Sequence, residues 1–225
     1  MPFYEKLLEN QLVYRLAQSI LVPGSRRLLK EPFDRLFRKS SGWILDVGCG
    51  PRPITPDPKG TLVGVDINPN YLRTYTGGFL DQNPRRVGNR SFPKRRLAYQ
   101  VSADALPFRN DVFDEIRNTS FFHHMDDVSS RKTLSEMNRC LKPGKRIIVI
   151  DAVWPRSKWL RPIAWATLSL DRGFHVRSES QFRGLLTGAL PGLWSFQRVT
   201  YTYTGMEYLI AIYRKRSHRS ISLVL

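Results

Sequence analysis

The sequence is poor in cysteine, with only Cys49 and Cys140 among 225 residues. Two cysteines provide neither a disulfide framework nor the ligand pattern of a metal site, so we expect two small buried thiols and no metal. No apolar run approaches the roughly 20 residues of a membrane-spanning helix. The first residues do not have the layout of a signal peptide, because Glu5 and Glu9 interrupt their apolar pattern. We therefore expect a cytoplasmic protein with no transmembrane segment.

Two common nucleotide-binding motifs are also missing. A dinucleotide site needs G-x-G-x-x-G and a helix N-terminus that faces the pyrophosphate. The glycine turn of this chain reads GCGPRP, with Pro53 in place of the third glycine. No G-K-[ST] follows any glycine turn, which argues against a P-loop.

Acidic residues are scarce, at 19 against 36 lysines and arginines, which gives a formal net charge of +17. Such an excess favours polyanionic partners: nucleic acid, an anionic membrane surface or a negatively charged substrate. A solvated basic surface explains the charge equally well. The remaining composition, 41% hydrophobic and 24% charged, is typical of a globular protein, and the length suits one domain.

The apolar pattern changes at about residue 42. Within residues 1–41, helical spacing predicts two helices, one around Leu7 to Ile20 and one around Leu28 to Phe37. The runs that follow are apolar throughout, which is typical of parallel strands covered on both faces. They comprise residues 43–48, 61–67, 97–104, 113–120 and 146–153, with a helix over 129–141 before the last. Two final runs, 195–204 and 207–216, are so close that they predict an antiparallel hairpin within residues 194–225, ahead of a basic tail.

Two segments lack this regularity. Residues 68–96 predict a long basic loop around a poor helix, and residues 154–193 form an insertion after the fifth strand. Trp154 and Trp165 of the insertion, with Tyr14 of the first helix, predict an apolar pocket, so the insertion is a candidate lid over a flat or lipid-like ligand. The alternatives are ordinary core packing and contact with a membrane surface, where Trp and basic residues occur together.

Three carboxylates end the first three predicted strands. Ligands of an open α/β sheet bind at the carboxyl ends of its strands, where Gly48 and Gly50 let the backbone turn tightly. Asp46 stands where it can receive a cationic amine, Asp66 where it can accept both hydroxyls of a ribose, and Asp104 where it can accept from an adenine amine. Each acid alone is also explained by turn chemistry. Together they favour a cationic adenosyl ligand over a pyrophosphate.

Five segments, in this order, resemble the motifs of class I S-adenosylmethionine-dependent methyltransferases, in particular the small-molecule group that includes quinone-biosynthesis enzymes. They are LDVGCGPRP, VGVDINP, SADALPF, FDEIRNTSFFHHMDD and RCLKPGKRIIVID. The resemblance covers residues 43–153. It implies a single domain over 1–225 with a Rossmann-like, seven-stranded mixed α/β sheet of strand order 3-2-1-4-5-7-6, helices on both faces, and S-adenosylmethionine as cofactor.

The resemblance also implies where the cofactor lies. The methionine moiety is expected near the glycine turn, the ribose at the end of the second strand, and the adenine near the end of the third. The residues implied are Asp46, Gly48, Cys49 and Gly50 for the methionine part, Asp66 for the ribose, Ile67, Asp104 and Ala105 for the adenine, and Asn118 through its backbone.

A histidine pair after the fourth strand provides the candidate general base. Methyl transfer to a centre that carries a proton gains from a base, and imidazole titrates near neutral pH. His123 and His124 are therefore candidate catalytic residues, and His175 of the insertion is a rival. The alternative is that these histidines brace the cofactor loop or are simply buried.

The leading hypothesis is methyl transfer to an O, N or C centre of a small-molecule acceptor. The positive charge keeps an RNA or nucleic-acid methyltransferase as an alternative. Against it, NTSFF stands where base-amine methylating enzymes have an Asn/Asp-Pro-Pro-aromatic motif. A third hypothesis is a non-catalytic regulator that binds S-adenosylmethionine.

Overall fold

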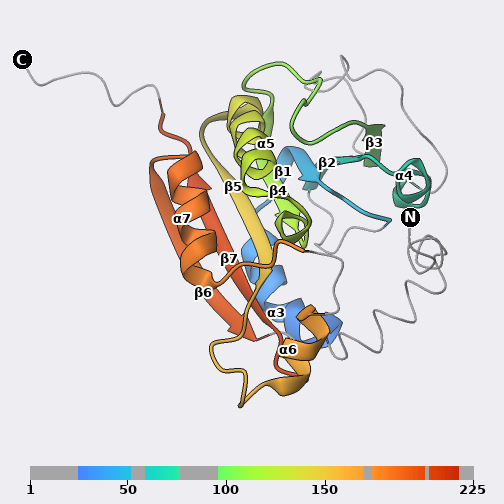
Figure 1. Cartoon of the computed structure of the whole chain (residues 1–225). Coiled ribbons are helices and arrows are strands. Elements are labelled where there is room, and N and C mark those ends of the chain that lie inside the picture. Colours follow the sequence, from blue (N-terminus) through green and yellow to red (C-terminus); the bar gives the residue numbers. More distant parts are fainter. Residues whose placement is uncertain (1–24, 52–58, 77–95, 170–173, 201–202, 218–225) are drawn as a thin grey trace, which may run out of the picture.

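The computed structural model describes residues 25–51, 59–76, 96–169, 174–200 and 203–217. They form a seven-stranded sheet of order β3-β2-β1-β4-β5-β7-β6 (Figure 1). The strands are β1 (Ser41–Val47), β2 (Lys59–Asp66), β3 (Arg96–Gln100), β4 (Phe113–Thr119), β5 (Leu141–Val153), β6 (Leu193–Thr200) and β7 (Glu207–Arg214). The first five are parallel, whereas β7 runs antiparallel to both β5 and β6. The predicted fold class, strand order and terminal hairpin are confirmed.

Helices cover both faces of the sheet (Figure 1). They are α3 (Ser25–Phe37), α4 (Pro69–Tyr75), α5 (Asp127–Cys140), α6 (Pro162–Ser169) and α7 (Glu179–Ala189), with a short 3-10 helix η2 (Phe122–His124). One face packs against α5 and α7 through residues such as Leu134 and Phe182. The other packs against α3 and α6 below β5 and β7, and against α4 below β1 and β2.

The central strands are apolar throughout because both of their faces are covered. In β1, the five residues from Trp43 to Val47 are all buried. Their side chains alternate between faces, so Leu45 belongs to the core under α5 and Ile44 to the core under α4. Asp46 follows the same alternation and faces α4.

Three predicted boundaries differ from the structure. The strand predicted over 97–104 ends at Gln100, so Asp104 lies in the following turn. The fifth strand begins at Leu141 rather than at residue 146, because Leu141 already pairs with Phe113 before a shift in register. Part of the predicted loop at 68–96 forms the helix α4, whose first turn is capped by the side chain of Asn68.

Helix α7 lies inside the segment that was expected to be an insertion. Ser178 and Gln181 form a reciprocal capping box at its start, and its buried residues Phe182, Leu185 and Leu186 join the main core. This part of residues 154–193 is therefore a structural layer of the sheet. Only residues 154–178 remain as the candidate lid, and Tyr14 lies outside the described residues.

No helix in the described ranges combines the length and the apolar character that crossing a membrane requires. The cytoplasmic location stays a prediction.

Candidate cofactor and acceptor site

A tight glycine turn follows the end of β1 at the carboxyl edge of the sheet. The backbone N–H groups of Gly48 and Cys49 both donate to the carbonyl of Val65, at 2.9 and 3.1 Å. Gly48 has a φ of 65°, and a Cβ there would lie 2.2 Å from the ring of Phe121, so only glycine fits. Gly50 has a φ of 61°, but a Cβ built on it meets no atom of the described residues within 4 Å. The turn therefore has open space in front of Gly50.

Asp66 ends β2 and lies against this turn. Its Oδ2 accepts a hydrogen bond from the Gly50 N–H at 3.0 Å, and its Oδ1 accepts one from the Asn68 N–H at 2.9 Å. These amides fix the carboxylate, while each oxygen keeps a lone pair for a ligand. Partial burial raises the pKa of Asp66, and the backbone hydrogen bonds only partly oppose that rise. The carboxylate is thus oriented by neutral groups and is suited to a hydroxyl donor or a cation.

Asp46 lies one strand away and is buried under α4. Tyr75, at the end of α4, donates its hydroxyl to Asp46 Oδ2 at 3.2 Å. Burial raises the pKa of Asp46 to about 6, although Arg117 on the neighbouring strand and the Tyr75 hydroxyl lower it. The charge of the nearby Asp66 adds to the rise. This carboxyl group is short of positive charge, so a cationic ligand group near it would favour its ionised form.

The predicted adenine contacts lie on the neighbouring strand ends. Ile67 follows Asp66 and exposes 71% of its surface. Asp104 and Ala105 belong to the turn after β3, which is the neighbour of β2, so they share the carboxyl edge of the sheet. The Asp104 carboxylate accepts a hydrogen bond from the hydroxyl of Ser102. An apolar side chain and a partly exposed carboxylate suit the face and the amine of a base.

Two predicted cofactor residues use their side chains for the fold. The Asn118 amide donates to the carbonyl of Val47 at 2.8 Å and ties β4 to the end of β1. The Cys49 thiol is buried against Gly64, where a Cβ would lie 2.7 Å from its sulfur. Burial raises the pKa of this thiol well above its usual value, and Asp46 and Asp66 add to the rise. The Cys49 thiol and the Asn118 Nδ2 are therefore engaged within the fold.

His123 forms a buried pair with an acid that the sequence reasoning missed. Its Nδ1 lies 2.5 Å from Oδ1 of Asp151 in β5. Burial raises the pKa of Asp151, but the charge of His123 and hydrogen bonds from His123 and Ala152 outweigh burial and leave this pKa lowered. When the Nδ1–H of His123 donates to the ionised Asp151, the lone pair of the neutral ring lies on Nε2. The available signal was an acid inside the apolar run RIIVIDAV.

His124 differs from its neighbour in exposure. Its side chain is exposed, whereas that of His123 is buried. The two ring centroids are 4.0 Å apart, at an angle of 45° between the ring planes. The structure thus places one histidine in a fixed pair and the other at the surface beside it.

Arg177 connects the candidate lid to the stretch Phe122–Asp127, which carries His123 and His124 and is called the histidine turn. Its Nη1 donates to the carbonyl of Phe122 at 2.9 Å, and its Nη2 donates to the carbonyl of Met125 at 2.7 Å. Its Nε and Nη2 also bind the carboxylate of Asp127, at 3.0 and 2.7 Å. The side chain is nearly buried. Sequence reasoning passed over Arg177 because nothing local distinguishes it from the many other arginines.

The backbone of His175 is hydrogen-bonded to the same turn. Its N–H donates to the carbonyl of His123 at 3.1 Å, while its side chain is exposed. Trp154 N–H donates to the carbonyl of Arg177, also at 3.1 Å. The three candidate histidines therefore lie on two adjacent segments.

Trp154 and Trp165 pack against each other. Their ring centroids are 4.4 Å apart with 29° between the ring planes, and both side chains are partly exposed. The indole N–H of Trp154 donates to the carbonyl of Val176 at 2.9 Å, which fixes this ring against the segment of His175. The pair forms an apolar surface after the carboxyl end of β5.

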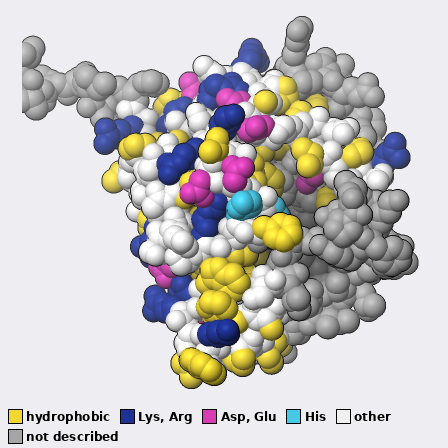
Figure 2. All heavy atoms as spheres, in the orientation of Figure 1, with side chains coloured by type: hydrophobic (Ala, Val, Ile, Leu, Met, Phe, Trp, Pro, Cys, Tyr) yellow, Lys and Arg dark blue, Asp and Glu magenta, His cyan; other side chains and the backbone are white. Residues whose placement is uncertain are grey.

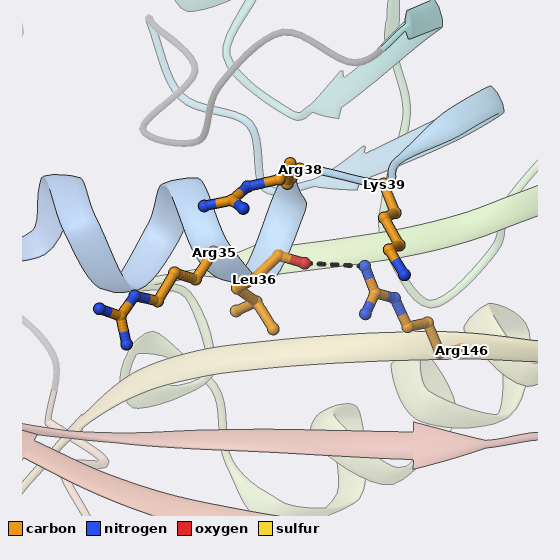
Figure 3. Close-up of a pocket in the computed structure, with 5 residues that line it drawn as sticks. All are labelled: Arg35, Leu36, Arg38, Lys39 and Arg146. Atoms are coloured by element: carbon orange, nitrogen blue, oxygen red, sulfur yellow. Dashed lines mark hydrogen bonds between the residues drawn. The ribbon is translucent and has the colours of Figure 1, made fainter.

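A separate hollow of about 480 Å³ lies at the opposite edge of the sheet (Figure 3). It is lined by Arg35, Leu36, Arg38, Lys39 and Arg146. Arg146 donates to the carbonyl of Leu36 at 2.9 Å and to Glu115 at 2.8 Å. β1 begins beside this hollow and ends at the glycine turn. The hollow is therefore at the opposite end of the strands from the carboxyl edge of the sheet.

Known methyltransferases resemble this chain. Residues 45–149 match the family described as a methyltransferase domain. A demethylmenaquinone methyltransferase of Symbiobacterium thermophilum is 33% identical over 124 residues, covering 52% of this chain and 45% of that protein. A ubiquinone/menaquinone biosynthesis C-methyltransferase of a Marinomonas species is 28% identical over 157 residues, covering 67% of this chain and 59% of that protein. The chain spans about half the length of the curated relatives it matches.

A solved structure shares the fold. The S-adenosylmethionine-dependent methyltransferase of Methanosarcina mazei matches with a TM-score of 0.57 and 19% identity, covering 83% of this chain and 98% of that one. An identity this low shows a shared fold. The match over residues 45–149 therefore assigns a methyltransferase domain to that part of the chain, and the strand order and the shared fold agree with it.

Proposed function

We propose that the chain transfers the methyl group of S-adenosylmethionine to an O, N or C centre of a small apolar acceptor. The observation that carries the proposal is the Asp66 carboxylate, which backbone amides hold beside the open turn at Gly50. Asp46, with its raised pKa, stands on the adjacent strand. When bound, S-adenosylmethionine supplies a methyl carbon that its sulfonium makes electrophilic.

In this proposal the residues of the carboxyl edge bind and orient the cofactor. Asp66 accepts the ribose hydroxyls, and Asp46 faces the positively charged methionine end near Gly48 and Gly50. Ile67 lies against the adenine, whose amine donates to Asp104, with Ala105 alongside. Cys49 and Asn118 contribute backbone groups and keep the turn in place. Holding the reacting groups in line is the main source of rate in such a displacement, up to roughly 7–11 kcal/mol.

We infer that His123 is the general base where the acceptor carries a proton. Asp151 orients its ring through Nδ1, which leaves Nε2 to accept that proton. His124 and His175 are the alternatives, and both expose their side chains beside the pair. If His123 is the base, His123→Ala lowers kcat by about 10²–10⁴-fold with little change in cofactor affinity. A larger loss with His124→Ala would assign the role to His124 instead.

Asp151→Asn tests positioning when the free energy of unfolding is measured alongside, because the new amide NH2 faces backbone N–H donors that now bind the carboxylate. It keeps the shape of the side chain but lets the other tautomer of His123 form, so we expect a lower kcat and a shifted pH profile at an unchanged KM for cofactor. A purely structural pair would lower the free energy of unfolding and leave the pH profile of the remaining activity unchanged.

The acceptor proposal rests on the stacked pair of Trp154 and Trp165. Aromatic rings that present an apolar surface favour a flat or lipid-like ligand. The names of the relatives above point to quinone precursors as acceptors of those proteins, and we propose an acceptor of that ring-bearing class for residues 154–178 to cover. Nucleic acid is the less favoured acceptor, because the hollow lined by four cationic side chains lies at the edge away from the histidines.

Calorimetry with S-adenosylmethionine tests the cofactor site. Wild type is expected to bind, and Asp66→Ala to lose roughly 100-fold or more in affinity, because hydrogen bonds to a charged group contribute about 1.5–3 kcal/mol each. The matched control is Asp111→Ala, an exposed acid that pairs with Lys215 away from this edge. A folded wild type that fails to bind would overturn the proposal.

Transfer of label separates an enzyme from a binding regulator. The protein is incubated with methyl-labelled S-adenosylmethionine and a metabolite extract, with and without added RNA. Nuclease treatment of the product then identifies label that was transferred to RNA. Label in an organic-soluble product supports the proposal, and label only in RNA supports the nucleic-acid alternative. Binding without any transfer supports the regulator.

A further inference from the structure

Four of the eight large hydrophobic side chains that are exposed in the described part of the chain fall within residues 159–174. Trp159 exposes 91% of its surface, Leu160 84%, Phe174 83% and Ile163 60%. We call these four residues the Trp159 patch. Figure 2 shows hydrophobic side chains in a band that runs from a histidine down to the lower end of the molecule. The connection from β5 to α6 forms that lower end in Figure 1.

Helix α6 explains why this surface is apolar. Its buried residues Ala164 and Leu168 pack in one cluster with Phe33 and Phe37 of α3. The other side of the helix exposes Ile163, so α6 is apolar on both sides although only one side is packed. A helix that is apolar all round is normally covered on both sides. The outer side of α6 and the loop before it therefore need an apolar environment.

Cationic side chains border the Trp159 patch. Arg156 has a side chain that is 75% exposed, and its ion pair with Glu179 is long, at 3.5 Å. Lys158 is exposed, and its Nζ lies 5.7 Å from the ring centroid of Trp165. Tryptophan and aliphatic side chains bordered by Lys and Arg are typical of surfaces that lie in a membrane interface. The net charge of +17 adds a long-range attraction to anionic headgroups.

We infer that the Trp159 patch docks the protein onto the surface of an anionic bilayer. Trp159 and Leu160 enter the headgroup region while Arg156 and Lys158 contact lipid phosphates. Phe174 precedes His175 in the segment that Arg177 ties to the turn of His123, so this exposed ring lies on the side of the candidate histidines. This inference rests on the proposed function in one respect: it adds that the apolar acceptor is delivered from the lipid phase.

Vesicle co-sedimentation tests the inference on the full chain. The probes are vesicles of phosphatidylcholine alone and of phosphatidylcholine with about 40 mol% phosphatidylglycerol. Wild type is expected to bind the anionic vesicles and not the neutral ones. The double variant Trp159→Ser/Leu160→Ser is expected to bind at least tenfold more weakly, because it removes two inserted side chains. Lys158→Glu is expected to weaken binding by about threefold or more, as a cation near the surface becomes an anion.

Matched controls come from the opposite edge of the sheet. Leu193 is 70% exposed and pairs with Arg214 beside the start of β5, so Leu193→Ser removes a comparable apolar side chain there. Lys39 is exposed and precedes β1, so Lys39→Glu makes the same change of charge. Both controls are expected to bind vesicles as wild type does. Controls that lose as much affinity as the patch variants would show that net charge or general stickiness, not this surface, drives binding.

Other results of these experiments would overturn docking or show a second copy of the chain as the partner. Wild type that binds neither vesicle overturns the inference, and so does equal binding to both. A concentration-dependent dimer that the double variant abolishes would show that the Trp159 patch binds a second copy of this chain. Calorimetry with S-adenosylmethionine on the same samples keeps the two proposals apart, because the patch variants are expected to retain the cofactor affinity of wild type. Cofactor binding without vesicle binding overturns docking alone.

Discussion

The carboxylates of the two halves of the sheet have different partners. In the half formed by β1 to β3, Asp46 is bonded by a tyrosine hydroxyl, Asp66 by two backbone amides and Asp104 by a serine hydroxyl. None of these partners carries a charge. These acids therefore keep their negative charge available for a ligand.

In the half formed by β5 to β7, Asp151 is paired with His123, and arginines neutralise Glu207 and Glu179. Glu207 is bound by Arg198 and by Arg161, the latter at 2.8 Å. Glu179 is bound by Arg198 at 2.8 Å and by Arg183 at 2.6 Å. These pairs join α7, β6, β7 and the segment before α6, so their role is to hold elements together.

The pKa values follow the same division. Burial raises the pKa of Asp46 and of Asp66. Burial also acts to raise the pKa of Glu179, but Arg198 and Arg183 outweigh it and leave that pKa lowered. In a chain with a net charge of +17, the acids whose hydrogen-bond partners are uncharged mark the proposed binding edge, although the charge of Arg117 partly offsets burial at Asp46.

The largest expected effect is the loss of Glu207. Glu207→Gln leaves Arg161 without this carboxylate and Arg198 with Glu179 alone, so the free energy of unfolding is expected to fall by about 3 kcal/mol, the low end for a broken buried pair. Urea denaturation measures it. The affinity of the folded variant for S-adenosylmethionine is expected to stay within about twofold of wild type. A loss of affinity like that of Asp66→Ala would contradict the division between the two halves.

Asp46 is expected to destabilise the ligand-free protein at neutral pH. Its pKa is about 6 in the folded state against a usual value of 3.8, so between these values the folded state holds a proton that the unfolded state has released. The free energy of unfolding therefore falls as pH rises through this window, by about 3 kcal/mol at 1.36 kcal/mol per pKa unit. Denaturation of wild type and Asp46→Asn from about pH 4 to pH 7 measures the difference, which is expected to move in favour of Asn. Parallel curves would contradict the raised pKa.

Cofactor affinity is expected to depend on the same proton. A cationic ligand favours the ionised form of Asp46, so binding below a pH of about 6 must expel its proton. The affinity is then expected to fall by up to about tenfold per pH unit below that value. Calorimetry in two buffers of different ionisation enthalpy detects the released proton. Asp46→Asn serves as the control, with weaker binding and no proton release.

The smallest expected effect is at Asp104. Its carboxylate is partly exposed and accepts from Ser102, so a single further hydrogen bond to an adenine amine contributes about 0.5–1.5 kcal/mol. Asp104→Ala is expected to weaken S-adenosylmethionine binding by about threefold to tenfold. Comparison with an analogue that lacks the exocyclic amine checks the assignment, because the variant should lose its discrimination between the two. An unchanged preference for the amine would place the adenine elsewhere.

The sheet and its binding edge were predictable because they depend on local pattern. Continuous apolar runs and the acids at their ends identified β1 and β2, and the close final runs identified the hairpin. The end of β3 was not predictable, since residues 101–104 read as a continuation of the strand while the chain turns after Gln100. The start of β5 depends on pairing between Leu141 and Phe113, which no local signal reports.

The polar contacts that complete the site depend on residues far apart in sequence. Tyr75 reaches Asp46 across 29 positions, and Asp151 reaches His123 across 28. Arg177 reaches the histidine turn across about 50. A lone tyrosine, acid or arginine carries no local signature of such a role. The proposed cofactor residues followed from strand ends, whereas the residues that fix the histidine required the folded arrangement.

Arg177 gives the acceptor side a mechanical property. The Arg177 guanidinium donates to two carbonyl groups and a carboxylate in the stretch from Phe122 to Asp127. The backbone carbonyl of Arg177 accepts from the Trp154 N–H. Displacing the strip around His175 would therefore drag the imidazole of His123 along with it. A single side chain thus couples the position of the His175 segment to that of the turn that carries His123.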